Sequence, residues 1–382
     1  MTTEDRKFLR LTLDLATNGR GLASPNPLVG AIVLDATGVE SGRGFYTWQT
    51  AKHAEIVALE QAGASADGGT LYVSLEPCCY EGRTPACTTA ILKSGIRRLV
   101  AITEDPHPKV RGGGFEILQQ AGVEVVHAVD FLPELSMEAQ RQNEAIFHFS
   151  QTGRPLVTLK SAVTLDGKIA ISRDHGGWIT SDIARDHVQQ VRHDHDAILT
   201  GIGTVLADDC LLTDRTGLPR RRPLMRIVAD SFLRLPLNSK LVESCEDDLI
   251  VVSTSAAPPK KMQMLKNMGV SVHVLDGTEG KVDLQAVVAW LGKQQLTSLI
   301  IEAGPNLNGA LLDAEIVDKM LLYYAPKILG TMESIPIVDR ADGQSHQEMI
   351  QFRDSRVFSV SPDEFAVETY PLKTADLAKM NR

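Results

Sequence analysis

The residues best suited to chemistry lie in two short segments of the N-terminal half. One residue separates His53 from Glu55, and three of the five cysteines, Cys78, Cys79 and Cys87, lie within ten residues of one another. A catalytic zinc site needs three protein ligands and one open position for water. His53, Cys78 and Cys87 would supply one imidazole and two thiolates, and Glu55 would carry protons to and from the activated water. The pattern therefore predicts a catalytic zinc centre.

The spacing is that of zinc-dependent deaminases, with one difference. Those enzymes carry H-x-E followed by P-C-x-x-C, and their glutamate is not a metal ligand. Here Pro77 precedes the first cysteine ligand, but eight residues rather than two separate Cys78 from Cys87, so the additional residues must form a loop. A lone histidine or a pair of cysteines is ordinarily core packing, whereas this combination in this order indicates zinc.

The hydrophobic pattern predicts the elements that position these residues. His53 is expected at the start of a helix with Glu55 in its first turn, because residues i and i+2 do not face each other on a helix. Cys78 follows a strand, and Cys87 opens the next helix, whose dipole favours a thiolate. The helices expected in this half are 8–18, 53–62, 87–93, 115–120 and about 134–149, and the strands are 28–34, 71–75, 99–102 and 123–127. Alternating strands and helices predict an α/β layered domain.

A second domain is expected to begin near residues 151–155, where turn-forming residues interrupt the last of these helices. The chain has 382 residues, enough for two domains, which we place at 1–150 and 151–382. The strands expected in the second half are 156–162, 196–200, 224–229, 249–253, 270–275 and 299–302, with a helix over 307–314.

Composition limits the classes of function. The net charge is −9, without the basic excess of a protein that neutralises many phosphates, so nucleic acid is not expected as a partner. No apolar stretch approaches the roughly 18 residues of a membrane span. Acidic residues interrupt the N-terminal segment, unlike a secretory signal, and five cysteines are too sparse for a disulfide framework. These features predict a cytoplasmic protein.

The second half carries a weaker signal for an anionic cofactor. The strand 299–302 runs into residues 303–306, and a glycine loop that opens a helix can bind phosphate, although a plain tight turn is the commoner interpretation. Residues 200–204 form a second glycine-bearing loop, which lacks the third glycine of a Rossmann fingerprint.

Three further side chains of this half, two arginines and a glutamate, could contact a phosphorylated ligand. Arg192 and Arg215 could bind its phosphate, or could be ordinary surface arginines. Glu302 leaves a buried strand beside the glycine loop. Trp178 could pack in the core or form a wall of a nicotinamide pocket, and the sequence does not separate these alternatives.

Two sets of motifs resemble one known family. The first half contains P-N-P-x-V-G (25–30), H-A-E (53–55), L-E-P-C (75–78) and G-R-T-P-x-C (82–87). The second half contains T-L-D-G-K (164–168), G-W-I-T-S (177–181), G-T-V-L-A-D-D (203–209) and E-A-G-P (302–305). In this order they resemble the bifunctional riboflavin-biosynthesis deaminase/reductase, from about residue 5 to the last thirty residues.

The resemblance implies an α/β protein with an N-terminal cytidine-deaminase-like α/β/α layered domain and a C-terminal dihydrofolate-reductase-like α/β domain. The first domain would use zinc to deaminate a diamino-(phosphoribosylamino)pyrimidinone by hydrolysis. The second would use NADPH to reduce the ribosyl group to a ribityl chain. The expected partner is this small phosphorylated pyrimidine, with no membrane, and the chain is expected to form a homo-oligomer, either a dimer or a tetramer.

Position matching also implies roles for individual residues. His53, Cys78 and Cys87 become the zinc ligands, and Glu55 becomes the catalytic proton carrier. The deaminase substrate contacts are Asn26, which would meet the ring, and Arg83 and Asp105, near the ribose and phosphate. The NADPH contacts are Val163, Trp178, Thr204, Asp208, Ser231, Gly304, Pro305, Asn306, Leu307, Asn308, Gly309 and Ala310. The reductase substrate contacts are Gly176, Arg192, Leu212, Arg215 and Glu302.

The chain departs from the family pattern at four positions. Tyr46 stands where a histidine is usual, and Tyr80 stands where a histidine or another polar residue is usual. Gly176 replaces a side chain, and Cys210 replaces a proline after Asp208-Asp209. Neither tyrosine position is a metal ligand, so the chemistry should persist while contacts to the ring or phosphate differ. Gly176 would leave only backbone at its position, and Cys210 would loosen a turn near the cofactor.

Two rival functions keep the same zinc site. One is a nucleoside or tRNA deaminase with a non-catalytic C-terminal domain, which turnover of cytidine or of an adenosine-containing RNA would support. The other makes the second half an oligomerisation scaffold, which a failure to bind or consume NADPH would support.

Overall fold

The computed structural model describes residues 1–82, 85–172, 177–340, 349–374 and 376. The chain forms two compact units. The first is Met1–Gly153 with Pro219–Arg222, and the second is Arg154–Leu218 with Pro223–Arg382. The division at 153/154 lies inside the segment 151–155.

The first unit is built on a five-stranded sheet with the order β2-β1-β3-β4-β5. The strands are β1 (Gly30–Leu34), β2 (Glu40–Phe45), β3 (Thr70–Leu75), β4 (Arg98–Thr103) and β5 (Glu124–His127). β1 is antiparallel to β2 and β3, whereas β3, β4 and β5 are parallel. Parallel strands bring the loops after β3 and β4, which include Cys78 and Asp105, to the same edge of the sheet.

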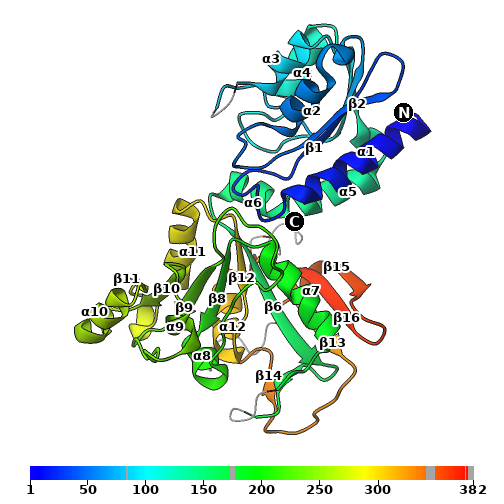
Figure 1. Cartoon of the computed structure of the whole chain (residues 1–382). Helices are drawn as coiled ribbons and strands as arrows, with labels where there is room; N and C mark the ends of the chain where they lie inside the picture. Colours follow the sequence, from blue (N-terminus) through cyan, green and yellow to red (C-terminus); the bar gives the residue numbers. More distant parts are fainter. Residues whose placement is uncertain (83–84, 173–176, 341–348, 375, 377–382) are drawn as a thin grey trace. The chain divides into compact units, whose positions relative to one another are not determined.

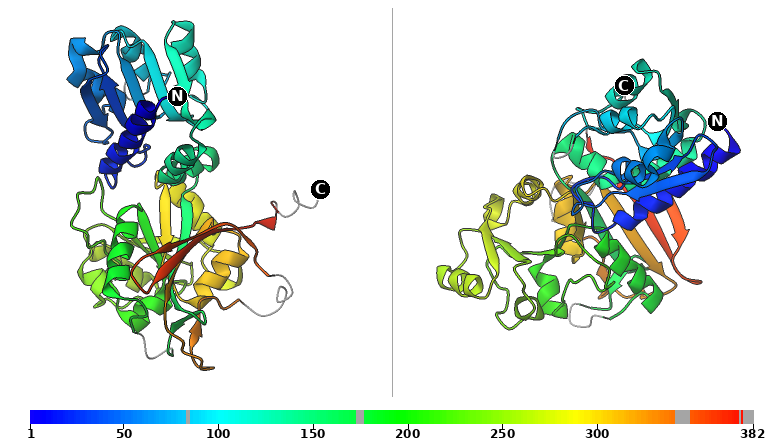
Figure 2. Two further views of the ribbon diagram at one scale, coloured as in Figure 1. Left: turned by 90° about the vertical axis from the view of Figure 1, so that its right-hand side faces the viewer. Right: turned by 45° about the horizontal axis from the view of Figure 1, so that its top comes forward.

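Helices cover both faces of this sheet. They are α1 (Thr3–Ala16), α2 (Ala54–Ala62), α3 (Cys87–Lys93), α4 (Gly113–Gln120), α5 (Pro133–Gln142) and α6 (Glu144–Thr152). One buried cluster joins α1 and α5 to one face, and another joins α2, α3 and α4 to the other face. Figure 1 shows α1 beside α5, and Figure 2 shows the unit from two further directions. The expected α/β/α layering is confirmed.

The single helix expected over about 134–149 is wrong, because it is broken at Asn143 into α5 and α6. The buried Asn143 side chain accepts a hydrogen bond from the Leu28 amide (2.7 Å) and donates one to the Leu28 carbonyl (2.9 Å). A helical periodicity cannot reveal this contact, which is made 115 residues away in the sequence. The hydrogen bonds between Asn143 and Leu28 hold in place the segment that carries Asn26.

The second unit is built on a nine-stranded sheet with the order β11-β10-β9-β8-β12-β6-β13-β16-β15. Its strands are β6 (Leu156–Thr164), β8 (Ala197–Gly201), β9 (Met225–Ala229), β10 (Leu249–Ser253), β11 (Ser271–Val274), β12 (Ser298–Ile301), β13 (Lys319–Ala325), β15 (Phe352–Ser359) and β16 (Phe365–Pro371). The strands from β11 to β13 are parallel, and β16 and β15 extend the sheet antiparallel. β7 (Lys168–Ala170) and β14 (Ile335–Pro336) form a separate pair.

Helices also cover both faces of the larger sheet (Figure 1). They are α7 (Asp182–His193), α8 (Ile202–Asp208), α9 (Lys240–Glu243), α10 (Pro259–Asn267), α11 (Leu284–Lys293) and α12 (Pro305–Asp313). Short 3-10 turns are η1 (Thr17–Gly19), η2 (Gly63–Ala66), η3 (Ala128–Asp130) and η4 (Thr278–Gly280). Within the described ranges, no helix has the length and apolar character needed to cross a membrane.

Candidate active sites

The three expected zinc ligands come from the ends of secondary-structure elements. His53 has extended backbone and is the N-cap residue of α2, Cys78 follows β3, and Cys87 is the first residue of α3. Glu55 lies in the first turn of α2. These placements confirm the expected positions relative to helices and strands.

The donor atoms of the three residues converge. His53 Nδ1 lies 3.1 Å from Cys87 Sγ and 3.5 Å from Cys78 Sγ, and all three donor atoms lie within 4.8 Å of one another. Ordinary Zn–N and Zn–S bond lengths in a tetrahedral site place neighbouring N and S ligand atoms about 3.6 Å apart. One nitrogen and two sulfurs at this separation fit a zinc ion with one position open.

The two cysteines differ in their affinity for protons. A hydrogen bond with Cys87 lowers the pKa of Cys78 to about 4, and His53 contributes further lowering. The same interaction, together with burial, raises the pKa of Cys87. One thiolate therefore exists here near neutral pH even without metal, and bound zinc would deprotonate the second cysteine as well.

Glu55 is buried beside the ligand cluster, with 3% of its surface exposed. Burial raises the pKa of its carboxyl group above the ordinary value, although His53 opposes the shift. A buried carboxyl group with a raised pKa takes up a proton more readily than an exposed one. This property suits the proton carrier of a hydrolytic deamination.

Asn26 lies in the segment before β1 and is half-buried. Its Nδ2 donates a hydrogen bond to the hydroxyl of Tyr46 (2.7 Å). The ring of Tyr46 stands edge-on to the imidazole of His53, with 5.6 Å between ring centroids. Tyr46 thus links the expected ring-binding residue to a metal ligand.

Asp105 follows β4 and is fastened by a residue that the sequence analysis did not single out. Both oxygens of the buried Glu76 accept backbone hydrogen bonds, from Asp105 (3.2 Å) and Gly112 (2.9 Å) on Oε2 and from Gly114 (2.9 Å) and Phe115 (3.4 Å) on Oε1. The glutamate of L-E-P-C therefore caps α4 and shapes the loop before it. Burial raises the pKa of Asp105 to about 6, and the charges of Glu76 and Cys78 add to the effect.

Two other deaminase positions complete this region. Arg83 lies outside the described residues. Tyr80 is partly exposed, stacks on His107 with ring centroids 6.0 Å apart, and has the Lys109 ammonium 5.7 Å from its ring centroid.

In the second unit, the expected NADPH positions 304–310 form the N-terminal half of α12. The helix begins at Pro305, two residues earlier than expected, and Gly304 is its N-cap residue without a side-chain cap. Such an end leaves backbone N–H groups available to an anion. A Cβ on Gly304 would lie 3.9 Å from Thr204 Oγ1, so two expected cofactor positions on α8 and α12 are neighbours.

Asn308 supports this end of α12 from within. Its side chain is fully buried, and its Nδ2 donates to the carbonyl groups of Ala303 (3.2 Å) and Ile337 (2.8 Å). Its Oδ1 has no hydrogen-bond partner among the described residues. Residues 303–306 therefore lead into the start of α12, where backbone N–H groups are available as donors and Asn308 Oδ1 is available as a buried acceptor. Both kinds of group suit the binding of a polar cofactor.

Glu302 and Arg192 form one buried ionic cluster with Lys160, a residue that the sequence analysis missed. Arg192 Nε and Nη2 donate to the two Glu302 oxygens (2.7 and 3.0 Å), and Lys160 Nζ lies 3.5 Å from Oε2. Arg192 is 9% exposed, so the surface-arginine alternative is wrong for it. A lysine as the one charged residue of the mostly buried strand β6 was the available signal.

The remaining reductase positions are spread over several elements. Val163 is buried in β6, Leu212 is buried, and Ser231 follows β9 with its Oγ accepting the Val282 amide (3.1 Å). Asp208 and Arg215 are exposed. Trp178 is 72% exposed, with the Arg185 guanidinium 4.5 Å from its ring centroid, so core packing is wrong for Trp178. Gly176 lies outside the described residues.

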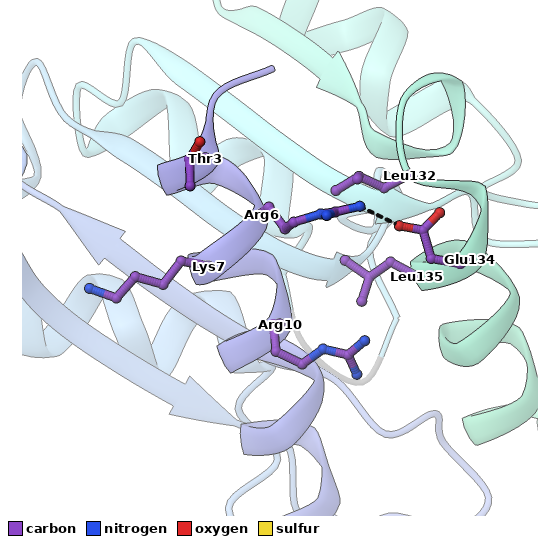
Figure 3. Close-up of a pocket in the computed structure, with 7 residues that line it drawn as sticks. All are labelled: Thr3, Arg6, Lys7, Arg10, Leu132, Glu134 and Leu135. Carbon is purple, nitrogen blue, oxygen red and sulfur yellow. Dashed lines mark hydrogen bonds and ion pairs between the residues drawn. The ribbon is translucent and has the colours of Figure 1, made fainter.

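A surface pocket of about 530 Å³ lies elsewhere on the first unit, between α1 and α5 (Figure 3). It is lined by Thr3, Arg6, Lys7, Arg10, Leu132, Glu134 and Leu135. Arg6 is already paired with Glu134 at 2.7 Å. The pocket shares no residue with either expected site.

Comparison with known proteins agrees with both halves. Residues 2–103 match the cytidine and deoxycytidylate deaminase zinc-binding region, and residues 155–364 match the RibD C-terminal domain. The riboflavin biosynthesis protein RibD of Actinobacillus pleuropneumoniae is 39% identical over 329 residues, covering 86% of this chain and 85% of that protein. RibD of Aquifex aeolicus is 37% identical over 359 residues, covering 94% and 96%. The solved structure of Acinetobacter baumannii RibD superposes with a TM-score of 0.82 at 32% identity, covering 97% and 99%.

The fold and the two sites define an enzyme that joins a zinc-binding deaminase domain of the cytidine deaminase class to an NADPH-dependent reductase domain. More specifically, the chain belongs to the RibD family of riboflavin biosynthesis proteins. The family, the fold class and both cofactors expected from the sequence are confirmed. A non-catalytic second half, as either rival function requires, does not agree with the match to the RibD reductase domain.

Proposed function

We propose that residues 1–150 remove the amino group from a diamino-(phosphoribosylamino)pyrimidinone by hydrolysis, and that residues 151–382 then reduce the ribosyl group of the product to a ribityl chain. A solved relative from Thermotoga maritima, 31% identical with a TM-score of 0.79, is described as a deaminase and reductase acting on these two compound classes. The observation that carries the first step is the convergence of His53, Cys78 and Cys87 beside the buried Glu55.

In the deaminase site, His53, Cys78 and Cys87 hold the zinc ion, which when bound supplies an acidified water as nucleophile. Glu55 would act as the proton carrier, accepting a proton and delivering one to the departing amino group, and burial raises the pKa of its carboxyl group. Asn26 binds the pyrimidinone ring. Asp105 and Arg83 bind the ribose and phosphate.

In the reductase site, NADPH supplies the hydride, and the protein orients cofactor and substrate. The N-terminus of α12, from Gly304 to Ala310, binds the cofactor phosphates, with Thr204 beside it. Val163, Trp178, Asp208 and Ser231 complete the cofactor contacts.

The reductase substrate lies against Glu302 and Arg192, whose mutual pairing holds both side chains in place. Arg215 is the exposed cation available to the substrate phosphate. Leu212 and Gly176 complete the substrate contacts.

The oligomeric state, the cellular location and the absence of nucleic-acid binding are also proposals. We expect a cytoplasmic homo-oligomer, a dimer or tetramer, that does not bind nucleic acid, in keeping with the net charge of −9.

One experiment tests both activities. NADPH oxidation is followed with the diamino-pyrimidinone phosphate as the substrate, in the wild-type protein and in Glu55→Gln. The wild type should consume NADPH, whereas Glu55→Gln should do so only when the deaminated intermediate is supplied. Loss of both activities in Glu55→Gln would contradict the independence of the two sites, and no NADPH consumption by the wild type would contradict the proposed function.

A further inference from the structure

Tyr46 occupies a position at which this chain departs from its family, and the structure gives it two contacts in the deaminase site. It directly follows β2, and the β1–β2 register pairs Gly30 with Phe45. The Tyr46 amide also donates to the Val29 carbonyl (3.1 Å). The antiparallel pairing therefore holds Tyr46 against the segment that leads from Asn26 into β1.

The tyrosine hydroxyl is a polar group in a buried side chain. Tyr46 is 4% exposed, so its hydroxyl must find a hydrogen-bond partner within the protein. Asn26 Nδ2 provides one at 2.7 Å. This bond holds the Asn26 side-chain amide at one angle, with Nδ2 toward Tyr46 and Oδ1 on its other side.

We propose that Tyr46 is a positioning residue that fixes the Asn26 amide so that Oδ1 accepts a hydrogen bond from an N–H group on the pyrimidinone ring. This inference rests on the proposed deaminase function. Without the hydroxyl, the amide loses the hydrogen bond that holds it at this angle, so Oδ1 is no longer held in place as an acceptor and the ring N–H loses its partner.

The backbone of Asn26 is held independently of this hydroxyl. The Asn26 amide donates to the Ala23 carbonyl (3.1 Å), and Asn143 binds both backbone groups of Leu28. Loss of the Tyr46 hydroxyl therefore frees the orientation of the side-chain amide and leaves the loop in place.

The ring and the hydroxyl of Tyr46 can be separated by one substitution. Tyr46→Phe keeps the ring edge against His53 and removes only the group that contacts Asn26. We expect an increase of about tenfold in the KM of deamination, equivalent to about 1.4 kcal/mol, with kcat changed less than threefold. The zinc content should stay at the wild-type value, and reduction of supplied intermediate should be unchanged.

A matched control comes from the opposite face of the same sheet. Tyr72 is 3% exposed, and its hydroxyl donates to Asp5 (2.8 Å) within the cluster that contains α1 and α5. Tyr72→Phe also removes a buried hydroxyl, but it should leave the KM unchanged. An equal rise in KM in both variants would make the effect of Tyr46 merely structural and would overturn the proposal.

A double-mutant cycle gives the decisive test. Asn26→Ala should raise KM by about the same factor as Tyr46→Phe, and the double variant should be no worse than Asn26→Ala, because both changes remove one interaction. Additive effects, or wild-type kinetics in Tyr46→Phe, would overturn the inference while the wild-type enzyme still deaminates. Absence of wild-type deamination would instead refute the proposed function, and the inference with it.

Discussion

Replacement of Glu76 by glutamine tests how the deaminase site is supported. The carboxylate accepts four backbone hydrogen bonds, two on each oxygen. A glutamine has one accepting oxygen, which we expect to face the buried Gly114 and Phe115 amides. The amide nitrogen then faces Asp105 and Gly112, whose N–H groups lose their acceptor.

The magnitude follows from these two lost bonds. Hydrogen bonds to a charged group contribute about 1.5–3 kcal/mol each, and the two half-buried donors can turn to water, so the loss is about 3 kcal/mol. Local opening would then be about a hundredfold more frequent. Because Asp105 lies in this loop, the KM of deamination should also rise, while reduction of supplied intermediate should not change.

Hydrogen–deuterium exchange of peptides covering residues 104–115 measures this directly and does not require two-state unfolding of a two-domain chain. Glu104→Gln is the matched control, because Glu104 is exposed in the same loop and should change the local free energy by less than about 0.5 kcal/mol. Unchanged exchange in Glu76→Gln, or equal acceleration in both variants, would refute the reasoning.

Two further predictions concern the reductase unit. Burial would raise the pKa of Glu302, but Lys160 and Arg192 outweigh it and lower that pKa to about 2, from 4.5. The ionised group therefore stabilises the folded unit above about pH 4.5, and this contribution, about 3 kcal/mol, should be lost as the pH falls toward 2. The free energy of unfolding in urea should consequently fall more steeply with decreasing pH in the wild type than in Glu302→Gln. Equal slopes would contradict this prediction. Arg215→Ala should raise the substrate KM of reduction about 10–100-fold and leave zinc content unchanged, and an unchanged KM would exclude Arg215 from phosphate binding.

Local sequence patterns predicted where the three expected ligands lie in the fold, because each of them lies at the end of an element. Helix signals placed His53 before α2 and Cys87 at the start of α3, and a buried strand placed Cys78. These positions depend on residues only a few places away. The α/β class followed from the same alternation.

Contacts between distant segments were not predictable in this way. Asn143 divides a helical stretch through bonds to Leu28, and Glu76 acts through the amides of residues 105–115. The strands β2, β7, β13, β14, β15 and β16 were missed. β15 is almost entirely exposed, so it lacks the alternation of buried residues that marks a strand. The Lys160 partner of Glu302 lies 142 residues away.

The zinc content of purified protein tests the central claim most directly. We expect one zinc ion per chain in the wild type, and loss of both zinc and deamination in Cys87→Ser. Cys79→Ser should keep both, because Cys79 adjoins Cys78 but lies outside the ligand cluster. A wild-type protein that deaminates without zinc, or a Cys87→Ser variant that retains it, would contradict the assignment of His53, Cys78 and Cys87 as the metal site.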